Sequence, residues 1–547
     1  MKNLLLFSLV ILFTLPVQAN EADQSLSSDS YKYQVAKKVF DKLVRAKGDK
    51  RLRMPDFVMG TKKRYVAWMN GKKGLIGLEE AAYDVCVQYG ADSLNAMAAL
   101  LGHEIIHYYE KHSWGNEFAT AFSDLNVSST VKNNSRSNDL KAMNETEADY
   151  QGGFLAYSAG YQTFGIMPKV LVDVYAAYGL PKEIPGYPSL DDRTKLAVES
   201  ELRLEDLISV FETANYMVVL QQYESVDQYY AYILKEYQSR EIFNNAGVNA
   251  VLAALQLFDE GAEQLKYAYP LQLDGQTRME KPKTRGDHLG FAERKEKRDK
   301  LLKQAQYYFE QAKALDKEYG TALINLACVA DLMEEYEEAS FYAKKAAKIA
   351  KKNRNAKVEA DAYIIRGIAN IHEGEVEDGK SFIERAKSKD EGAVPLANLN
   401  LTILAGNTPE SPKVKPKLSL TKEKVDGVDL DDFMSEIDVD NLLEINGDLT
   451  CGVKNLDNSK ILLNLVGGGQ KGYTLLHLTK NGYASSTGDG MSIGSSKMDV
   501  VKKYGTPSRI QEARQGQYLV YDFKNIAFFI SDNKVDSWCL YRVKADE

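Results

Sequence analysis

The chain has 547 residues, too many for a single hydrophobic core, so its length predicts several domains. Hydrophobic residues make up 44% of it and charged residues 27%, which is typical of globular proteins and excludes wholesale disorder. The net charge of −8 argues against a nucleic-acid partner.

The first 19 residues have the pattern of a secretory signal peptide. Lys2 precedes an apolar run from Leu4 to Leu15, and small residues follow up to Ala19. An uncleaved membrane anchor is the alternative, but a spanning helix needs about 20 apolar residues and this run has 12. No later stretch is apolar enough to span a bilayer. We therefore expect an exported protein with no transmembrane span once residues 1–19 are removed.

Residues 20–204 contain the residues with catalytic potential. Apolar residues at helical spacing after Ser93 predict a helix that carries the sequence His-Glu-Ile-Ile-His, from His103 to His107. Two histidines four residues apart project from one helix face and can share a tetrahedral metal ion. The carboxylate of Glu104 lies beside that face, where it can accept a proton from a water at the metal. His112 falls on the opposite face of a continuing helix, so it is expected to be a surface residue or an indirect contact.

A third metal ligand is predicted in the segment Asn144-Glu-Thr-Glu-Ala-Asp149, which we expect to open a helix that runs to Tyr161. Glu145 and Asp149 are four residues apart and project together. Glu145 can complete the ligand set, while Asp149 accepts a hydrogen bond from a histidine ring and orients it. The alternative is a solvated acidic helix start. Gly152 and Gly153 argue against it, because small residues permit close approach to the first helix.

These two motifs together resemble the gluzincin metallopeptidases of family forty-eight, which includes the CAAX prenyl proteases and HtpX-like proteases. The pair H-E-x-x-H and E-x-x-A-D matches residues 103–107 and 145–149. The resemblance is greatest to soluble periplasmic bacterial members fused to tetratricopeptide (TPR) repeats. It implies one zinc ion per chain, held by His103, His107 and Glu145, with Glu104 as general base and acid and Asp149 as an indirect support.

A later element of the family, H-P-x-x-x-x-R, occurs here as Tyr187 to Arg193, with tyrosine in place of histidine. Tyr187 or Arg193 is expected to assist the oxyanion that forms during hydrolysis, although Tyr187 can equally well be a packing residue. The predicted strand Arg64–Asn70 can pair with an extended substrate backbone or simply pack in a sheet. His288 is a candidate self-inhibitory zinc ligand from a loop.

Residues 205–406 are predicted to be almost wholly helical. A period of 34 residues relates small and aromatic positions, as in TPR repeats, and a third copy follows after six extra residues; a plain helical bundle is the alternative. The related positions are Ala305, Phe309 and Ala312, followed by Ala339, Ala343 and Ala346. Residues 275–303 contain clustered lysine and arginine with proline and glycine, and read as an exposed charged insertion that is either solvated or a patch for an anionic partner.

The C-terminal part divides into a linker with an acidic segment, residues 407–448, and a small α+β domain of unknown role, residues 449–547. That domain is predicted to have five strands and one helix at about Ser496–Tyr504. Cys451 and Cys539 lie in its strand-like sequence. They are either a disulfide or two buried free thiols, and Cys86 and Cys328 complete the set of four cysteines.

The predicted fold is therefore multidomain: a mainly α, zincin-type peptidase domain with a small sheet, an α-helical TPR solenoid, and a small α+β domain. The expected function is a zinc-dependent endopeptidase that acts on protein or peptide substrates, exported to the bacterial periplasm or secreted. The resemblance implies a role in envelope protein quality control, with the repeats contacting envelope proteins. The alternative is a TPR-based adaptor or chaperone-like binding protein whose peptidase fold is silent or self-inhibited.

Overall fold

The computed structural model describes residues 25–110, 136–183, 189–258, 266–280, 282, 289–407, 422–427, 430, 442–479, 482–513 and 515–545. The predicted signal peptide lies outside these residues. Contacts between residues divide the chain into two compact units, 1–208 and 209–547. The long helix α8 (Leu190–Val219) crosses the boundary between them.

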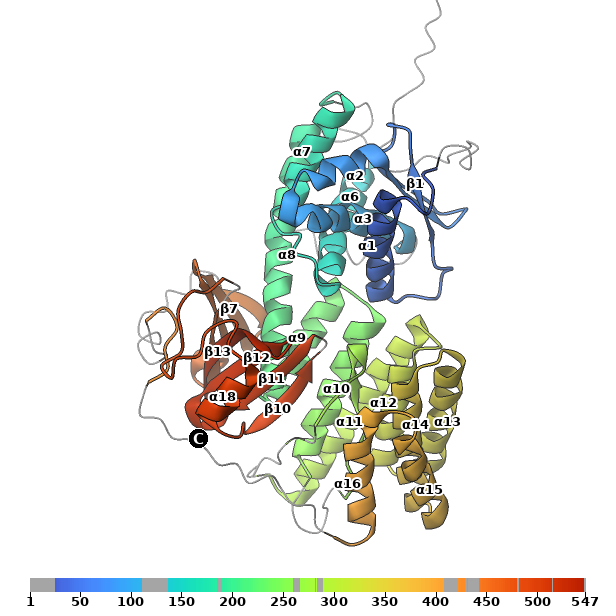
Figure 1. Ribbon diagram of the computed structural model, residues 1–547, viewed down its shortest axis with the longest axis vertical. Helices are drawn as coiled ribbons and strands as arrows, with labels where there is room; N and C mark the ends of the chain where they lie inside the picture. The colour runs from blue at the N-terminus through green and yellow to red at the C-terminus, as the bar shows by residue number, and fades with distance from the viewer. Residues whose placement is uncertain are drawn as a thin grey trace, which may run out of the picture. The chain divides into compact units, whose positions relative to one another are not determined.

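The first unit combines helices with a three-stranded sheet (Figure 1). The sheet has the order β1-β3-β2, with β1 parallel and β2 antiparallel to β3. Its strands are β1 (Asp56–Gly60), β2 (Ala67–Asn70) and β3 (Leu75–Glu79). The helices before α8 are α1 (Tyr31–Lys47), α2 (Glu80–Val87), α3 (Ser93–Tyr109), α6 (Arg136–Ser158) and α7 (Met167–Tyr178).

Strand β2 begins three residues later than its sequence predicts. The backbone N–H groups of Arg64, Tyr65 and Val66 all donate to the buried carboxylate of Glu79, over 2.7 to 3.1 Å. Val66 also has a φ of 67°, which is incompatible with a strand. The residues before Ala67 therefore wrap around a carboxylate instead of extending the sheet, and β2 remains as a short edge strand.

In the second unit, the helices that follow α8 pack mainly against their sequence neighbours (Figure 1). Their bounds are α9 (Tyr223–Glu236), α10 (Arg240–Gln256), α11 (Phe291–Leu315), α12 (Gly320–Leu332), α13 (Tyr336–Lys352), α14 (Ala356–His372), α15 (Val376–Lys387) and α16 (Val394–Leu404). The positions with the 34-residue period are buried on α11 and α13. On α14 and α15, Gly367 and Gly379 lie so close that a Cβ on either would come within 2.6 Å of the other's carbonyl oxygen.

The charged insertion predicted at 275–303 is exposed over most of residues 290–300, as expected, but the described residues there form a hairpin strand and a helix instead of a loop. Gln272–Leu273 (β4) and Thr277–Arg278 (β5) form a short antiparallel hairpin among the helices, and Thr277 is buried. From Phe291 onward the lysine- and glutamate-rich sequence is the first part of α11. Lysine and glutamate are good helix formers, so a stretch rich in them can be helical. Their charge places them on the solvent side of the helix.

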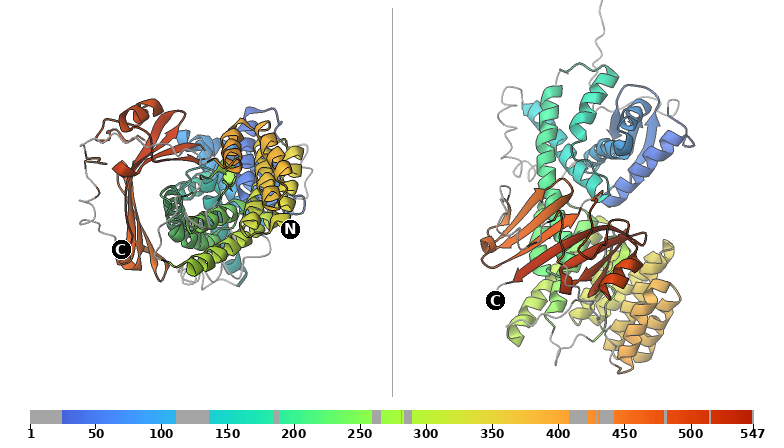
Figure 2. Two further views of the ribbon diagram at one scale, coloured as in Figure 1. Left: turned by 90° about the horizontal axis from the view of Figure 1, so that it is seen from below. Right: turned by 60° about the vertical axis from the view of Figure 1, so that its left-hand side comes forward.

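The C-terminal sheet has eight antiparallel strands in the order β10-β11-β12-β13-β9-β8-β7-β6 (Figure 2). Two four-stranded meanders meet where β9 pairs with β13. The strands are β6 (Leu442–Asn446), β7 (Leu449–Asn455), β8 (Ser459–Val466), β9 (Gly472–Thr479), β10 (Arg509–Ala513), β11 (Gly516–Tyr521), β12 (Ile526–Ser531) and β13 (Lys534–Ala545). The predicted helix is confirmed as α18 (Lys497–Tyr504), capped by Ser496.

Alternation along the strands buries both faces of this sheet. One face packs against Val500 and Tyr504 of α18, and the other against Val219 and Leu220 at the end of α8. The sheet also begins before the predicted boundary at 449, because β6 starts at Leu442. Within the predicted linker and acidic segment, Val425 and Leu430 are buried in the core beside α18. An apolar residue in an acidic sequence is enough to anchor that part of the chain.

All four cysteines are buried free thiols, so the disulfide alternative for Cys451 and Cys539 is wrong. Cys451 lies on β7 and Cys539 on β13, with β8 and β9 between them. Three strand spacings separate them by about 14 Å, whereas the Cα atoms of a disulfide lie at most about 7 Å apart.

Candidate metal centre

The two histidines of the His-Glu-Ile-Ile-His sequence lie on one face of α3, as predicted. Their Nε2 atoms are 3.0 Å apart. His103 and Glu104 are buried, and His107 retains a side-chain exposure of 11%. The helix is rich in alanine and leucine, which favour helix and need no hydrogen bonds, so it can run through the interior of the unit.

Helix α6 brings a carboxylate to both histidines. One oxygen of Glu145 lies 3.4 Å from Nε2 of His103, and the other lies 3.6 Å from Nε2 of His107. The ligand atoms of the three residues lie within 4.8 Å of one another, so this buried group could hold a metal ion. Among the described residues, no other group of three or more histidine, cysteine or acidic side chains has this geometry.

Glycines on both helices make this approach possible. A Cβ on Gly152 would lie 2.8 Å from the backbone nitrogen of His103, and one on Gly102 would lie 2.7 Å from the carbonyl oxygen of Gly152. Any side chain at either position would push α3 and α6 apart. The prediction that α6 opens at Asn144 is wrong, because the helix begins at Arg136. Glu145 is therefore placed by a continuous helix, and the alternative of a solvated acidic helix start is excluded.

Asp149 takes the predicted place behind His103. Its Oδ1 lies 2.6 Å from Nδ1 of His103, and both groups are buried. A proton on Nδ1 in this hydrogen bond leaves the lone pair of Nε2 directed toward His107 and Glu145. This arrangement selects the ring nitrogen that is available to a metal ion.

Arg193, expected near the oxyanion, contacts carboxylates in the structure. From the first turn of α8, its guanidinium pairs with Glu145 and lies 3.5 Å from Asp149, with the arginine 5% exposed. A buried cation beside two buried carboxylates offsets the cost of removing them from water. Arg193 therefore positions Glu145 and Asp149, and a direct role at the oxyanion stays a prediction.

The electrostatics of the centre are compatible with a divalent cation. Burial lowers the pKa of His103, but Asp149 and Glu145 outweigh it and raise that pKa to about 10. Burial raises the pKa of Glu104 well above its usual value. At neutral pH the ring of His103 is therefore a cation. With that ring neutral and the carboxyls ionised, the formal charges of Arg193, Glu104, Glu145 and Asp149 give a net −2, which a divalent cation would neutralise.

The pKa values of the remaining ligand side chains are also shifted toward metal binding. Burial, and then the charge of His103, lower the pKa of His107 to about 4, so His107 is neutral at pH 7. Burial raises the pKa of Glu145, but Arg193 and the histidines outweigh this effect and hold it well below its usual range. A neutral imidazole and an ionised carboxylate are the forms that coordinate metals.

Glu104 is distinguished by its lack of hydrogen bonds within the described part of the chain. Both of its carboxyl oxygens are buried, the residue is 0% exposed, and neither oxygen has a partner there. Buried polar groups normally have partners, so such a group calls for an explanation. A carboxyl that hydrogen-bonds a water at a metal provides one, and it is the role that the sequence predicts for Glu104.

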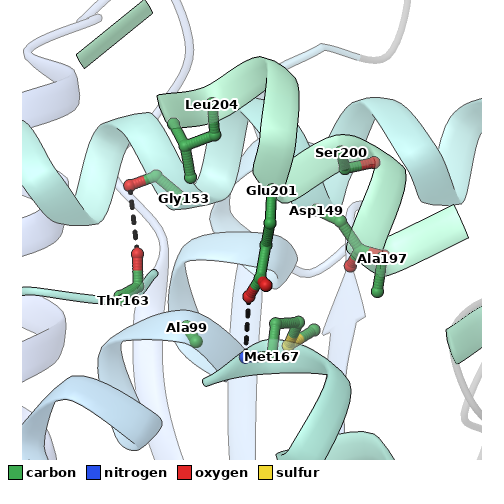
Figure 3. Close-up of a pocket in the computed structure, with 9 residues that line it drawn as sticks. All are labelled: Ala99, Asp149, Gly153, Thr163, Met167, Ala197, Ser200, Glu201 and Leu204. Carbon is green, nitrogen blue, oxygen red and sulfur yellow. Dashed lines mark hydrogen bonds between the residues drawn. The ribbon is translucent and has the colours of Figure 1, made fainter. Parts of the chain in front are cut away.

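A small cavity lies behind Asp149, lined by parts of α3, α6 and α8 (Figure 3). Glu201 of α8 extends into it and accepts a hydrogen bond of 3.3 Å from the backbone N–H of Met167. Burial raises the pKa of Glu201 to about 7. Glu201 was not predicted from the sequence, because in a charged stretch of α8 nothing local marks one glutamate as buried.

Three residues considered from the sequence lie outside the described residues: Tyr187, His112 and His288. Their predicted roles therefore stay predictions. No protein-family model matches the chain, and a search of curated proteins finds no relative. Of the helices that the structure describes, none has the length and apolar character needed to cross a membrane.

Proposed function

We propose that this protein is a zinc-dependent endopeptidase that hydrolyses peptide bonds in exported proteins. The observation that supports this proposal is the convergence of His103, His107 and Glu145 beside the buried carboxyl of Glu104, which has no hydrogen-bond partner among the described residues. Two imidazoles and one carboxylate are the ligand set of catalytic zinc sites, which keep a fourth position for water or substrate. The motif resemblance adds the expected setting, an envelope peptidase of family forty-eight.

Zinc, when bound, would polarise the scissile carbonyl and make a water acidic enough to attack at neutral pH. The residues of the chain perform the remaining tasks. Glu104 accepts the proton of the attacking water and returns it to the leaving amine. Burial raises the pKa of Glu104, and a carboxylate that must first accept and then donate a proton needs a pKa above that of an ordinary exposed glutamate.

The surrounding residues hold this arrangement in place. Asp149 orients the ring of His103, and Arg193 keeps Glu145 ionised and directed toward the histidines. Strand β2 forms one edge of the small sheet, so its outer side is the expected place for an extended substrate backbone to pair. Oxyanion assistance from Tyr187 remains part of the proposal.

The test combines metal analysis with proteolysis of casein. Wild-type protein is expected to contain about one zinc ion per chain and to cleave casein. Glu104→Gln should retain zinc and lose activity by at least about a hundredfold, whereas Glu145→Ala should lose both. Glu147→Gln, on the same helix and outside the ligand set, is the matched control and should retain both.

Two results would refute the proposal. Wild-type protein that binds no zinc would remove the metal centre, and equal activity of wild type and Glu104→Gln would remove its catalytic role. A zinc-bound wild type without activity toward any unfolded protein would favour the alternative, an adaptor with a silent peptidase fold.

A further inference from the structure

An extended segment of the second unit lies against the helices α10, α12, α14 and α16. Residues 266–280, here called the inserted segment, run extended to Leu273 and return through β5. The residues that hydrogen-bond or pair with the segment through their side chains are mostly on every second helix. On these helices they are Asn244 and Asn245 on α10, Asn325 and Asp331 on α12, Asp361 on α14 and Asn400 on α16. Asp390, Tyr319 and Gln511 contact the segment from outside these four helices.

Two buried asparagines hold the backbone of this segment. The side-chain amide of Asn400 accepts a hydrogen bond from the N–H of Ala268 at 2.8 Å and donates to its C=O at 2.9 Å. Asn325 does the same with Gln272, at 2.9 and 2.8 Å, and Asn244 adds a hydrogen bond to the same carbonyl. A side-chain amide that hydrogen-bonds both the N–H and the C=O of one residue makes the same backbone hydrogen bonds as a neighbouring β-strand would. Such contacts recognise an extended backbone and do not depend on its side chains.

Two buried carboxylates recognise side chains of the same segment. Asp331 accepts a hydrogen bond of 2.6 Å from the hydroxyl of Tyr269. Asp361 accepts from the side chain of Gln272 and pairs with Arg278 at 2.8 Å. Both aspartates are at most 2% exposed. Asp331 also pairs with His372 of α14 at 3.1 Å. A buried carboxylate is costly without donors, so whatever covers this surface is expected to bring a cationic or amide group to Asp361 and a hydroxyl donor to the remaining acceptor sites of Asp331.

The helices have contacts of their own that do not involve this segment. α10 packs on α11, α12 on α13 and α14 on α15, the last pair through Gly367 and Gly379. By contrast, the segment's own strand pairing is limited to Gln272 with Arg278 and Leu273 with Thr277. It is held mainly by side chains of the helices, as a ligand would be. Helical arrays of this kind commonly use such a surface to bind extended peptides.

We propose that the surface formed by α10, α12, α14 and α16 is a recognition groove for an extended peptide, and that the inserted segment is a displaceable internal occupant. The peptide has a tyrosine whose hydroxyl reaches Asp331. Three or more residues after that tyrosine, it has an amide or cationic side chain that reaches Asp361. Its backbone replaces Ala268 and Gln272 at Asn400 and Asn325. This groove is separate from the metal centre, so the inference does not depend on peptidase activity.

The first test uses wild-type full-length protein and a synthetic peptide with the sequence of residues 266–278. Hydrogen exchange is measured by mass spectrometry with and without excess peptide. Displacement should raise exchange in the inserted segment at least about tenfold, while α12 stays protected. A control peptide with phenylalanine at the position of Tyr269 and alanine at that of Arg278 should have at least about tenfold less effect. Unchanged exchange, or equal effects of the two peptides, would overturn the proposal.

The second test weakens the internal occupant directly. A full-length Tyr269→Phe/Arg278→Gln variant, shown to be folded by circular dichroism, should bind the fluorescein-labelled peptide at least about tenfold more tightly than wild type. Adding Asn400→Leu, which has a similar volume but no amide, should reverse that gain. Binding that is no tighter in the double variant, or that survives loss of Asn400, would show that the inserted segment is a permanent part of the core.

Discussion

Zinc binding at the candidate centre is expected to release about one proton at pH 7. The perturbation is the addition of zinc to protein that has been freed of metal with a chelator. His103, with a pKa raised to about 10, holds this proton in the structure. A metal ion at Nε2 of His103 displaces it.

The same proton gives the affinity for zinc a definite pH dependence. A proton and zinc compete for His103 below its raised pKa, so zinc affinity must rise as the pH rises toward 10 and fall as the pH falls. One competing proton changes the affinity about tenfold per pH unit while the ring is protonated. The low pKa of His107, about 4, means that this ring adds no second proton at pH 7.

Isothermal titration calorimetry in buffers with different protonation enthalpies measures the proton release directly. Asp149→Asn removes the carboxylate that raises the pKa of His103, so it should release fewer protons than wild type. Equal proton release by wild type and Asp149→Asn would refute the assignment of the proton to His103, and a pH-independent affinity would refute the competition between proton and zinc.

Other predictions concern the stability of the fold around the centre. Gly152→Ala should lower the free energy of unfolding by about 2 kcal/mol or more in urea titrations, because the added Cβ would meet the backbone of α3; Gly290→Ala, with open space around it, should change it by less than about 0.5 kcal/mol. Arg193→Leu should cost about 3–5 kcal/mol in the same assay, because it leaves two buried carboxylates without their cation, and an unchanged midpoint would contradict this. Burial raises the pKa of Glu147 to about 7, so the folded state binds a proton more tightly than the unfolded state. The free energy of unfolding of wild type should therefore decrease as the pH rises from about 4 to 7. Glu147→Gln should be more stable than wild type by about 1–3 kcal/mol at pH 8 but not at pH 4. Without reductant, all four cysteines should react with a thiol reagent in denaturant, and fewer would indicate a disulfide.

The sequence predicted the ligand residues because their spacing is a local property. His103 and His107 share a face of any α-helix, and Glu145 and Asp149 share a face of the next. The helical period of the apolar residues between Ser93 and His103 was also evident. What local spacing cannot specify is where a helix begins when its flanking residues have no clear cap, so the start of α6 was predicted too late.

The tertiary structure decided which distant groups meet. Sequence alone determined that two histidines and two carboxylates could form a metal site, since helix geometry is the same in every protein. Only packing brought Arg193 to Glu145 and buried Glu201, and only packing placed the inserted segment against Asn325 and Asn400. Those contacts join residues far apart in the chain, and their energies depend on burial, which no local pattern of residues encodes.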